Sequence, residues 1–208
     1  MQYYAILFYE VNMNIRLYKN KALTITTTAL FLSLGVIFPQ LFHALGLGTA
    51  FSPMHLPVLL CGLMCGGFLG ALVGFATPFI SSFIFSMPPL FPNAVVMSIE
   101  LAAYGLLIGL FYRFFKNKKK DFFKKTAVVF SLIIAMAGGR ILYGILMWLI
   151  VFAQGGIYSL NVFLTAVIIG CWPGLVLQIT SIPLIMIVLS KTHTLLKYDS
   201  FTDSKSYD

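Results

Sequence analysis

Two ionisable residues, Glu100 and Arg140, lie inside long apolar stretches of the sequence. A charged side chain costs several kcal/mol in an apolar, water-free environment, so residues of this kind are usually functional. One interpretation is that the two residues pair with each other. The other is that the Arg140 guanidinium binds a ligand carboxylate, for which its planar array of N–H donors is well shaped. Both hold if Glu100 keeps Arg140 in place until a ligand arrives.

Neutral polar and apolar residues occur together near the ends of neighbouring apolar segments. They are Pro53, Met54, His55, Asn93, Gln154, Tyr158 and Asn161. Hydrogen-bonding groups between apolar walls are typical of a small-molecule site, so we expect an outward-facing pocket there. His43 and His55 have no carboxylate beside them, so no metal site is predicted. The three cysteines lie inside apolar runs, where they are expected to be packing residues.

The elements that must position these residues are membrane-spanning helices. Of the 208 residues, 60% are hydrophobic and 10% are charged, whereas a soluble domain has about 25% charged residues. So few charges cannot cover a globule of this size, and lipid must be the solvent. At roughly 20 residues per crossing, the expected fold is an all-α integral membrane protein, a bundle of six transmembrane helices. The predicted spans are 22–45, 54–64, 67–85, 94–115, 126–152 and 160–189.

The second and third spans are the shortest, and the pair Gly66-Gly67 separates them. Segments of this length barely cross the hydrocarbon, so a single kinked, re-entrant hairpin is an alternative. The stretch MPPLFPN, residues 87–93, contains three prolines and is predicted to be a rigid loop.

All Lys and Arg residues except Arg140 lie near the N-terminus, at 113–125 or near the C-terminus. Because cytoplasmic loops are enriched in basic residues, both termini are predicted to be cytoplasmic and the number of spans to be even. The net charge of +8 is then a topology signal rather than a sign of nucleic-acid binding. The predicted organisation is a cytoplasmic segment 1–20 (with 1–12 as either a mis-assigned extension or an interfacial segment rich in aromatics), a membrane domain 21–191 and a cytoplasmic polar tail 192–208.

Small residues recur at helical spacing in three segments. Glycines lie at 62, 66, 70 and 74 and again at 105 and 109, and the first span carries Ala22, Thr26, Ala29 and Ser33. Small residues let helix backbones approach closely in lipid. They serve either internal packing of the bundle or, in the first span, docking of another membrane protein.

Several activities have no support in the sequence. It contains no HExxH, no GxSxG and no Gly-rich phosphate loop with its Lys. The predicted cytoplasmic segments are too short to hold an ATPase, and the two halves show no paired broken helices of a secondary transporter. We therefore expect a non-catalytic, pocket-bearing bundle that needs another protein for energy.

Residues 51–105 resemble the substrate-binding S component of energy-coupling factor (ECF) vitamin transporters. The similar features are the Pro-Met-His-x-Pro start at 53–57, the Gly-spaced hairpin, the Met-Pro-Pro loop, and Glu100 followed by Tyr104-Gly105. GCWPGLVLQITSIP, residues 170–183, is similar to the last span of that family. The small face of the first span resembles the surface by which S components dock, although Ser33 departs from strict alanines.

The resemblance implies a multi-pass protein of a bacterial plasma membrane that binds a vitamin or precursor near the outer surface and has no cofactor. Its partners would be a transmembrane coupling subunit and two cytoplasmic ATPases, whose ATP hydrolysis topples the S component in the membrane. Arg140, Glu100, His55, Asn93, Tyr104 and Asn161 are the expected substrate-binding residues. Similarity to the pantothenate-type branch, with Arg140 as a carboxylate partner, favours pantothenate. Pyridoxine-like or hydroxymethylpyrimidine ligands, cobalamin and folate remain open.

Two rival functions come from other classes of protein. A structural or assembly protein of six spans would need no polar pocket, and a stand-alone secondary carrier would transport without partners. Co-purification of a coupling subunit and ATPases distinguishes an S component from both.

Overall fold

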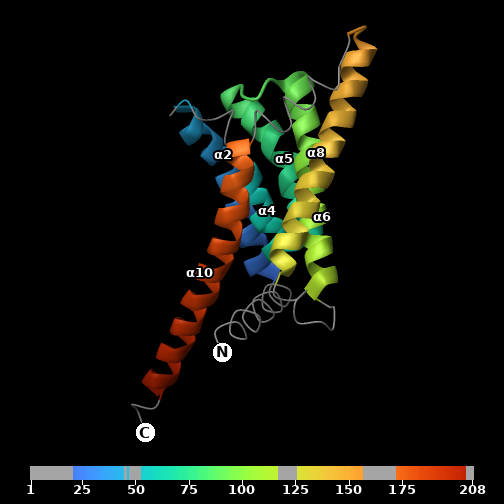
Figure 1. The fold of residues 1–208 in the computed structure, drawn as a ribbon. Helices are drawn as coiled ribbons and strands as arrows, with labels where there is room; N and C mark the ends of the chain where they lie inside the picture. Colours follow the sequence, from blue (N-terminus) through green and yellow to red (C-terminus); the bar gives the residue numbers. More distant parts are fainter. Residues whose placement is uncertain (1–20, 45, 47–52, 117–125, 157–171, 205–208) are drawn as a thin grey trace.

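The computed structural model describes residues 21–44, 46, 53–116, 126–156 and 172–188, and the helical backbone of 189–204. Every regular element within these ranges is a helix (Figure 1). The helices are α2 (Lys21–Ala44), α4 (His55–Met64), α5 (Gly67–Phe85), the short η1 (Leu90–Ala94), α6 (Val95–Lys116), α8 (Ala127–Ala153) and α10 (Trp172–Ser204).

The predicted all-α membrane bundle is confirmed. α2, α5, the η1–α6 stretch and α8 are each long and apolar enough to cross a membrane, while α4 and the first part of α10 (Trp172–Val188) are shorter apolar helices. Many large apolar side chains point away from the bundle, such as Phe68 (73% exposed) and Ile25 (69% exposed). Side chains of this kind need lipid around them, because they would be unfavourable in water.

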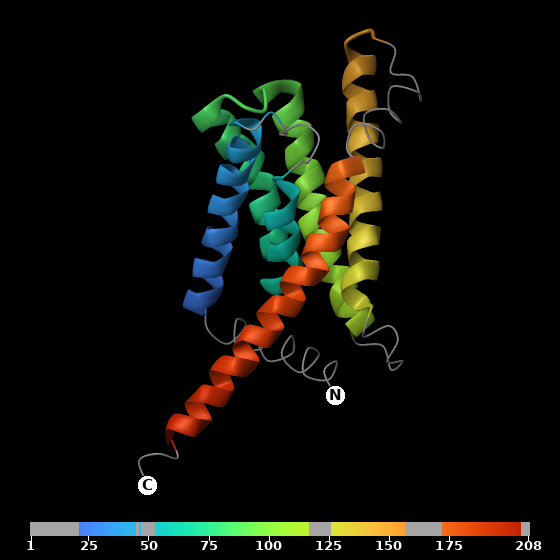
Figure 2. The same cartoon turned by 60° about the vertical axis from the view of Figure 1, so that its left-hand side comes forward.

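α6 is the central helix of the bundle. It packs against α4, α5 and α8. α2 packs against α4 and α5, and α10 packs against α8 and α4. α10 continues well past residue 189, where the sixth span was expected to end, and its second half extends away from the other helices (Figures 1 and 2). No Gly or Pro follows Pro183 within α10 to interrupt the helix. The beginning of that predicted span, 160–171, lies outside the described residues.

The segment 54–85 forms two helices, α4 and α5, on either side of Cys65 and Gly66. α4 has 10 residues, about 15 Å at ~1.5 Å per residue, which is roughly half the hydrocarbon thickness. Gly66 has a φ of 103° between α4 and α5, a value that side chains other than Gly rarely allow. Because α4 is so short, His55 at its first position is buried inside the bundle rather than at its surface.

The predicted rigid loop 87–93 ends in a helical turn. Phe91, which precedes Pro92, is extended (φ −125°, ψ 134°), as a residue before proline prefers to be. The Ala94 N–H donates to the carbonyl of Pro89 at 3.0 Å. The three prolines therefore allow a turn that runs directly into α6.

Glycines let α4, α5 and α6 touch backbone to backbone. A Cβ at Gly62 would stand 2.6 Å from the Gly105 carbonyl oxygen, and a Cβ at Gly70 would stand 2.6 Å from the Gly62 Cα. The additional glycines at this contact are Gly67, Gly74 and Gly109. These close approaches confirm internal packing for the recurring glycines except Gly66, where a Cβ would meet only Arg113 Nη2 at 3.8 Å.

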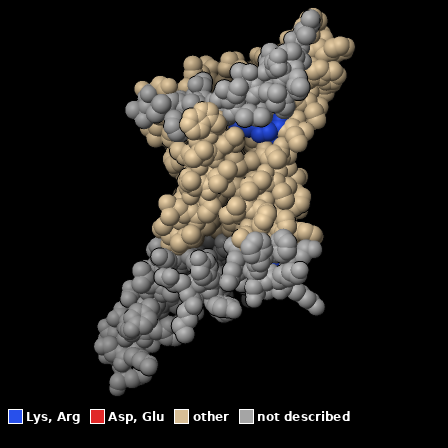
Figure 3. All heavy atoms as spheres, viewed as in Figure 1, with Lys and Arg blue, Asp and Glu red and all other residues tan. Residues whose placement is uncertain are grey.

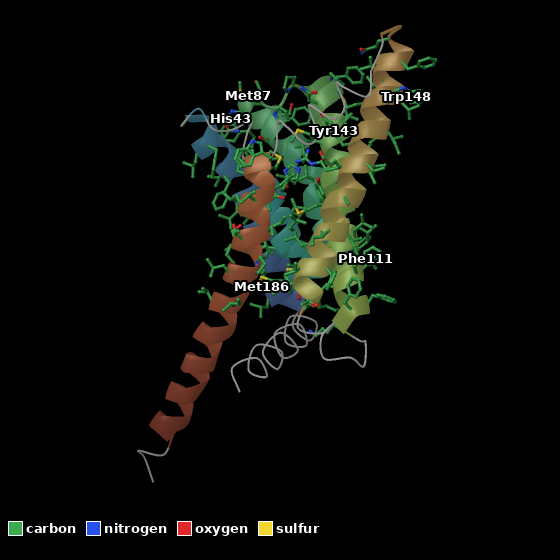
Figure 4. All side chains as sticks on the ribbon, in the orientation of Figure 1. His43, Met87, Phe111, Tyr143, Trp148 and Met186 are labelled. Atoms are coloured by element: carbon green, nitrogen blue, oxygen red, sulfur yellow. The ribbon has the colours of Figure 1, made fainter. Side chains whose placement is uncertain are left out.

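The two ends of the bundle differ in charge. Lys21 begins α2, and Arg113 and Lys116 lie in the last turn of α6. Both helix ends lie at the same end of the bundle, which we call the basic end (Figures 1 and 2). His43, Met87 and Trp148 lie at the opposite end, here called the loop end (Figure 4). α2 begins and α10 finishes at the basic end, as an even number of crossings requires.

The glycine contact generates a stability prediction. Gly62→Ala should lower the melting temperature in detergent, by the equivalent of about 1–3 kcal/mol, because its Cβ would press on a rigid backbone. Gly138→Ala is the matched control, since its Cβ would stand 2.7 Å from the flexible Leu107 Cδ1. The control should leave the melting temperature unchanged or raise it slightly, and equal losses in both variants would contradict this account.

Candidate functional site

The Glu100 carboxylate lies at the meeting point of three helices. Glu100 is 1% exposed and is the only acidic side chain that the structure describes. Its Oε1 accepts a hydrogen bond from the Tyr104 hydroxyl at 3.0 Å. The same oxygen lies 3.4 Å from Arg140 Nη1 of α8 and 3.8 Å from His55 Nε2 of α4. We call these four residues the Glu100 cluster.

The local sequence explains how the side chains converge. Tyr104 lies one helical turn after Glu100, so the two share a face of α6. Gly139 of α8 leaves space for the Tyr104 ring, because a Cβ there would stand 2.7 Å from Tyr104 Cε1. The His55 and Tyr104 rings meet edge to face with centroids 5.1 Å apart, a favoured aromatic geometry.

The predicted pairing of Arg140 with Glu100 is confirmed by this geometry. The pair is a charged contact in an apolar interior, where removing one partner leaves an expensive buried charge. The Arg140 side chain is 12% exposed and that of Glu100 is 2% exposed, so Arg140 is the more exposed member of the pair. Figure 3 shows one basic patch near the loop end, between α8 and α10, on a visible surface without acidic atoms among the described residues.

The other predicted site residues differ in their burial and in their distance along the chain from the Glu100 cluster. Pro53 and Met54 are buried directly before α4, next to His55. Asn93 is half-buried in η1, and it is not one of the side chains that contact the Glu100 carboxylate. Gln154 is exposed beyond the end of α8. Tyr158 and Asn161 lie outside the described residues.

Sequence reasoning missed Gln178 of α10. Its side chain is 2% exposed, and its Nε2 has no hydrogen-bond partner among the described residues. Its signal in the sequence was a polar amide within an apolar span, which indicates a functional position in the same way as a charged residue there.

The small face of the first span points outward. Ala22, Thr26, Ala29 and Ser33 are all exposed on α2. The Thr26 and Ser33 hydroxyls donate to the carbonyls of Ala22 and Ala29 in the same helix, each at 2.9 Å. The face therefore presents small side chains whose polar groups are already satisfied within α2.

The Glu100–Arg140 contact predicts non-additive stability effects. Glu100→Gln and Arg140→Met should each destabilise the protein, by about 3–5 kcal/mol if the pair is fully buried, because each leaves one charged group uncompensated. The double variant should be less destabilised than the sum of the two. Melting temperatures of all four proteins test this coupling. Ser98→Ala is the control on α6, since its buried hydroxyl donates within its own helix, to the Ala94 carbonyl at 2.7 Å. Strict additivity of the two charge changes would contradict direct contact.

Comparison with known proteins agrees with this architecture. The family model "ECF transporter, substrate-specific component" matches residues 23–192. Neither a search of curated proteins nor a search of solved structures finds a match. The family match spans the Glu100 cluster and all of α4, α5, η1, α6 and α8, together with most of α2 and the first part of α10. Members of this family are transport subunits rather than enzymes, and this chain belongs to the substrate-specific components of ECF transporters.

Proposed function

We propose that this S component binds pantothenate, with Arg140 as the partner of the substrate carboxylate. The observation that carries the proposal is a partly exposed guanidinium held beside a buried carboxylate within a membrane bundle. Glu100 makes the burial of Arg140 tolerable in the absence of ligand, and Tyr104 donates a hydrogen bond to the carboxylate oxygen that Arg140 approaches. An arriving carboxylate gains charge-assisted hydrogen bonds without requiring Arg140 to be ordered first.

The remaining contacts would come from neutral groups around Arg140. His55 lies against both Glu100 and Tyr104, and Asn93 and Asn161 are further candidates for the hydroxyl and amide groups of the substrate. Apolar residues beside them, such as Met54, would cover the dimethyl-substituted carbon of pantothenate. The proposed site opens toward the loop end, which on this reading is the outer side of a bacterial plasma membrane.

Transport would depend on partners. ECF S components work with a transmembrane coupling subunit and ATPases. We assign docking of the coupling subunit to Ala22, Thr26, Ala29 and Ser33, because this exposed face allows close helix approach. On this proposal the two ATPases act on the cytoplasmic side, where the basic end and both termini lie.

Pantothenol tests the carboxylate contact, because it has a hydroxymethyl group where pantothenate has its carboxylate. The purified protein should bind pantothenate about 10- to 100-fold more tightly than pantothenol, the value expected for charge-assisted hydrogen bonds. Arg140→Ala should lose this preference while it still binds pantothenol. Isothermal titration calorimetry measures both affinities.

Two results would overturn the substrate assignment. One is unmeasurable binding of pantothenate to the wild-type protein, and the other is an unchanged affinity in Arg140→Ala. Mass spectrometry of small molecules released from the purified protein would then identify another ligand, such as a pyridoxine-like compound. Uptake into liposomes by the chain alone would instead favour a secondary carrier.

The docking face is tested by one enlarged side chain. Ala29→Phe should abolish co-purification of the coupling subunit and ATPases, because the ring prevents close helix contact, while pantothenate binding stays unchanged. Ala137→Phe, at an exposed position of α8, is the matched control and should retain the partners. If Ala29→Phe still co-purifies with the coupling subunit and ATPases, α2 is not the docking helix.

A further inference from the structure

We infer that Gln178 is a specificity-determining residue that donates its side-chain N–H to an uncharged acceptor of the substrate. The inference rests on the proposed function and extends it to α10, a helix that contributes nothing to the Glu100 cluster. It assigns the substrate two different recognition groups: a carboxylate at Arg140 and a carbonyl or hydroxyl oxygen at Gln178.

The position of Gln178 follows from the buried face of α10. Gly174, Gln178, Ile182 and Met186 recur every four residues and are all buried, so they form the face that α10 turns toward the bundle. α10 packs against α8 and α4, the helices that carry Arg140 and His55. Figures 1 and 2 both show the first half of α10 beside these helices, before it diverges.

The hydrogen bonding of Gln178 differs from that of its polar neighbours. The Thr180 and Ser181 hydroxyls donate to carbonyls of their own helix, those of Val176 and Leu177. Gln40, on α2, donates from its Nε2 to Ser81 Oγ at 3.4 Å. Gln178 Nε2 alone among these donors is buried without a partner in the described part of the chain.

An unsatisfied amide is unfavourable in an apolar interior, and lipid offers no water to satisfy it. An apolar residue of similar size would fill the same space without that cost. The amide is therefore understandable if a ligand completes its hydrogen bonds, as in sites that reject analogues lacking the matching polar group. The amide carbonyl of pantothenate is an acceptor of the required kind, and pantothenol has the same carbonyl.

The test is Gln178→Leu, which keeps the size of the side chain and removes both amide groups. Affinities for pantothenate and pantothenol should fall by the same factor, about tenfold or more, because the two compounds share the uncharged acceptor. The melting temperature without ligand should stay the same or rise, since an unsatisfied donor is lost. Thr180→Val is the control: its position is exposed on the same helix, and it should bind both compounds as the wild-type protein does.

Each outcome separates this inference from the substrate assignment. Unchanged affinities in Gln178→Leu overturn the role of Gln178 and leave the Arg140 contact intact. Loss of pantothenate binding alone would also overturn it, because that pattern places Gln178 at the carboxylate. If the wild-type protein binds neither compound, the substrate assignment fails, and the melting temperature of Gln178→Leu without ligand tests the inference by itself. A melting temperature below that of the wild-type protein overturns the inference, because the amide would then stabilise the fold. A higher one supports an amide that has no partner within the protein. Gln178→Met, which also removes both amide groups and has an unbranched, flexible side chain, provides a second variant if Gln178→Leu does not fold, and it should show the same common loss of affinity.

Discussion

The burial of one carboxylate in an apolar bundle constrains the rest of this structure. Glu100 is almost fully shielded from solvent, and its Oε1 lies within 4 Å of polar atoms from Tyr104, Arg140 and His55. An isolated charge in that position would be very unfavourable, so α4 and α8, which carry His55 and Arg140, must remain in register with α6. The contact therefore fixes how α4 and α8 sit against the central helix.

Close backbone packing makes this convergence possible. Glycines at the contact of α4, α5 and α6 remove the side chains that would otherwise hold these helices apart. The shortness of α4 has a second consequence, because it places His55 at the depth of the buried carboxylate. Gly139 acts in the same way on α8, where it admits the Tyr104 ring beside Arg140. Packing and the polar contacts are thus linked, because the helices that the glycines bring together are those that carry the Glu100 cluster.

The polar cluster, the basic end and the small face of α2 lie in separate parts of the molecule. The polar cluster lies within the bundle and reaches the surface through Arg140, while the described basic residues of α2 and α6 lie at the other end. The small face of α2 points away from the bundle. This separation suits a subunit that binds a small molecule in one place and depends on other proteins for energy. α10 connects the two ends, and its buried amide faces the helices that carry Arg140 and His55.

The sequence alone determined the class of the protein and most of its helices, because hydrophobic composition and the positions of Lys and Arg respond to the membrane rather than to tertiary contacts. It also identified Glu100, Arg140 and His55, since charged or polar groups stand out in apolar runs. It did not determine whether 54–64 and 67–85 are two separate spans or a single kinked, re-entrant hairpin, because short apolar segments are ambiguous in length. Nor did it single out Gln178, since an amide's significance depends on which groups surround it. Only the tertiary structure decided that Glu100, Tyr104, Arg140 and His55 meet at one oxygen, because that meeting depends on helix depth and rotation, which spacing along the chain does not specify.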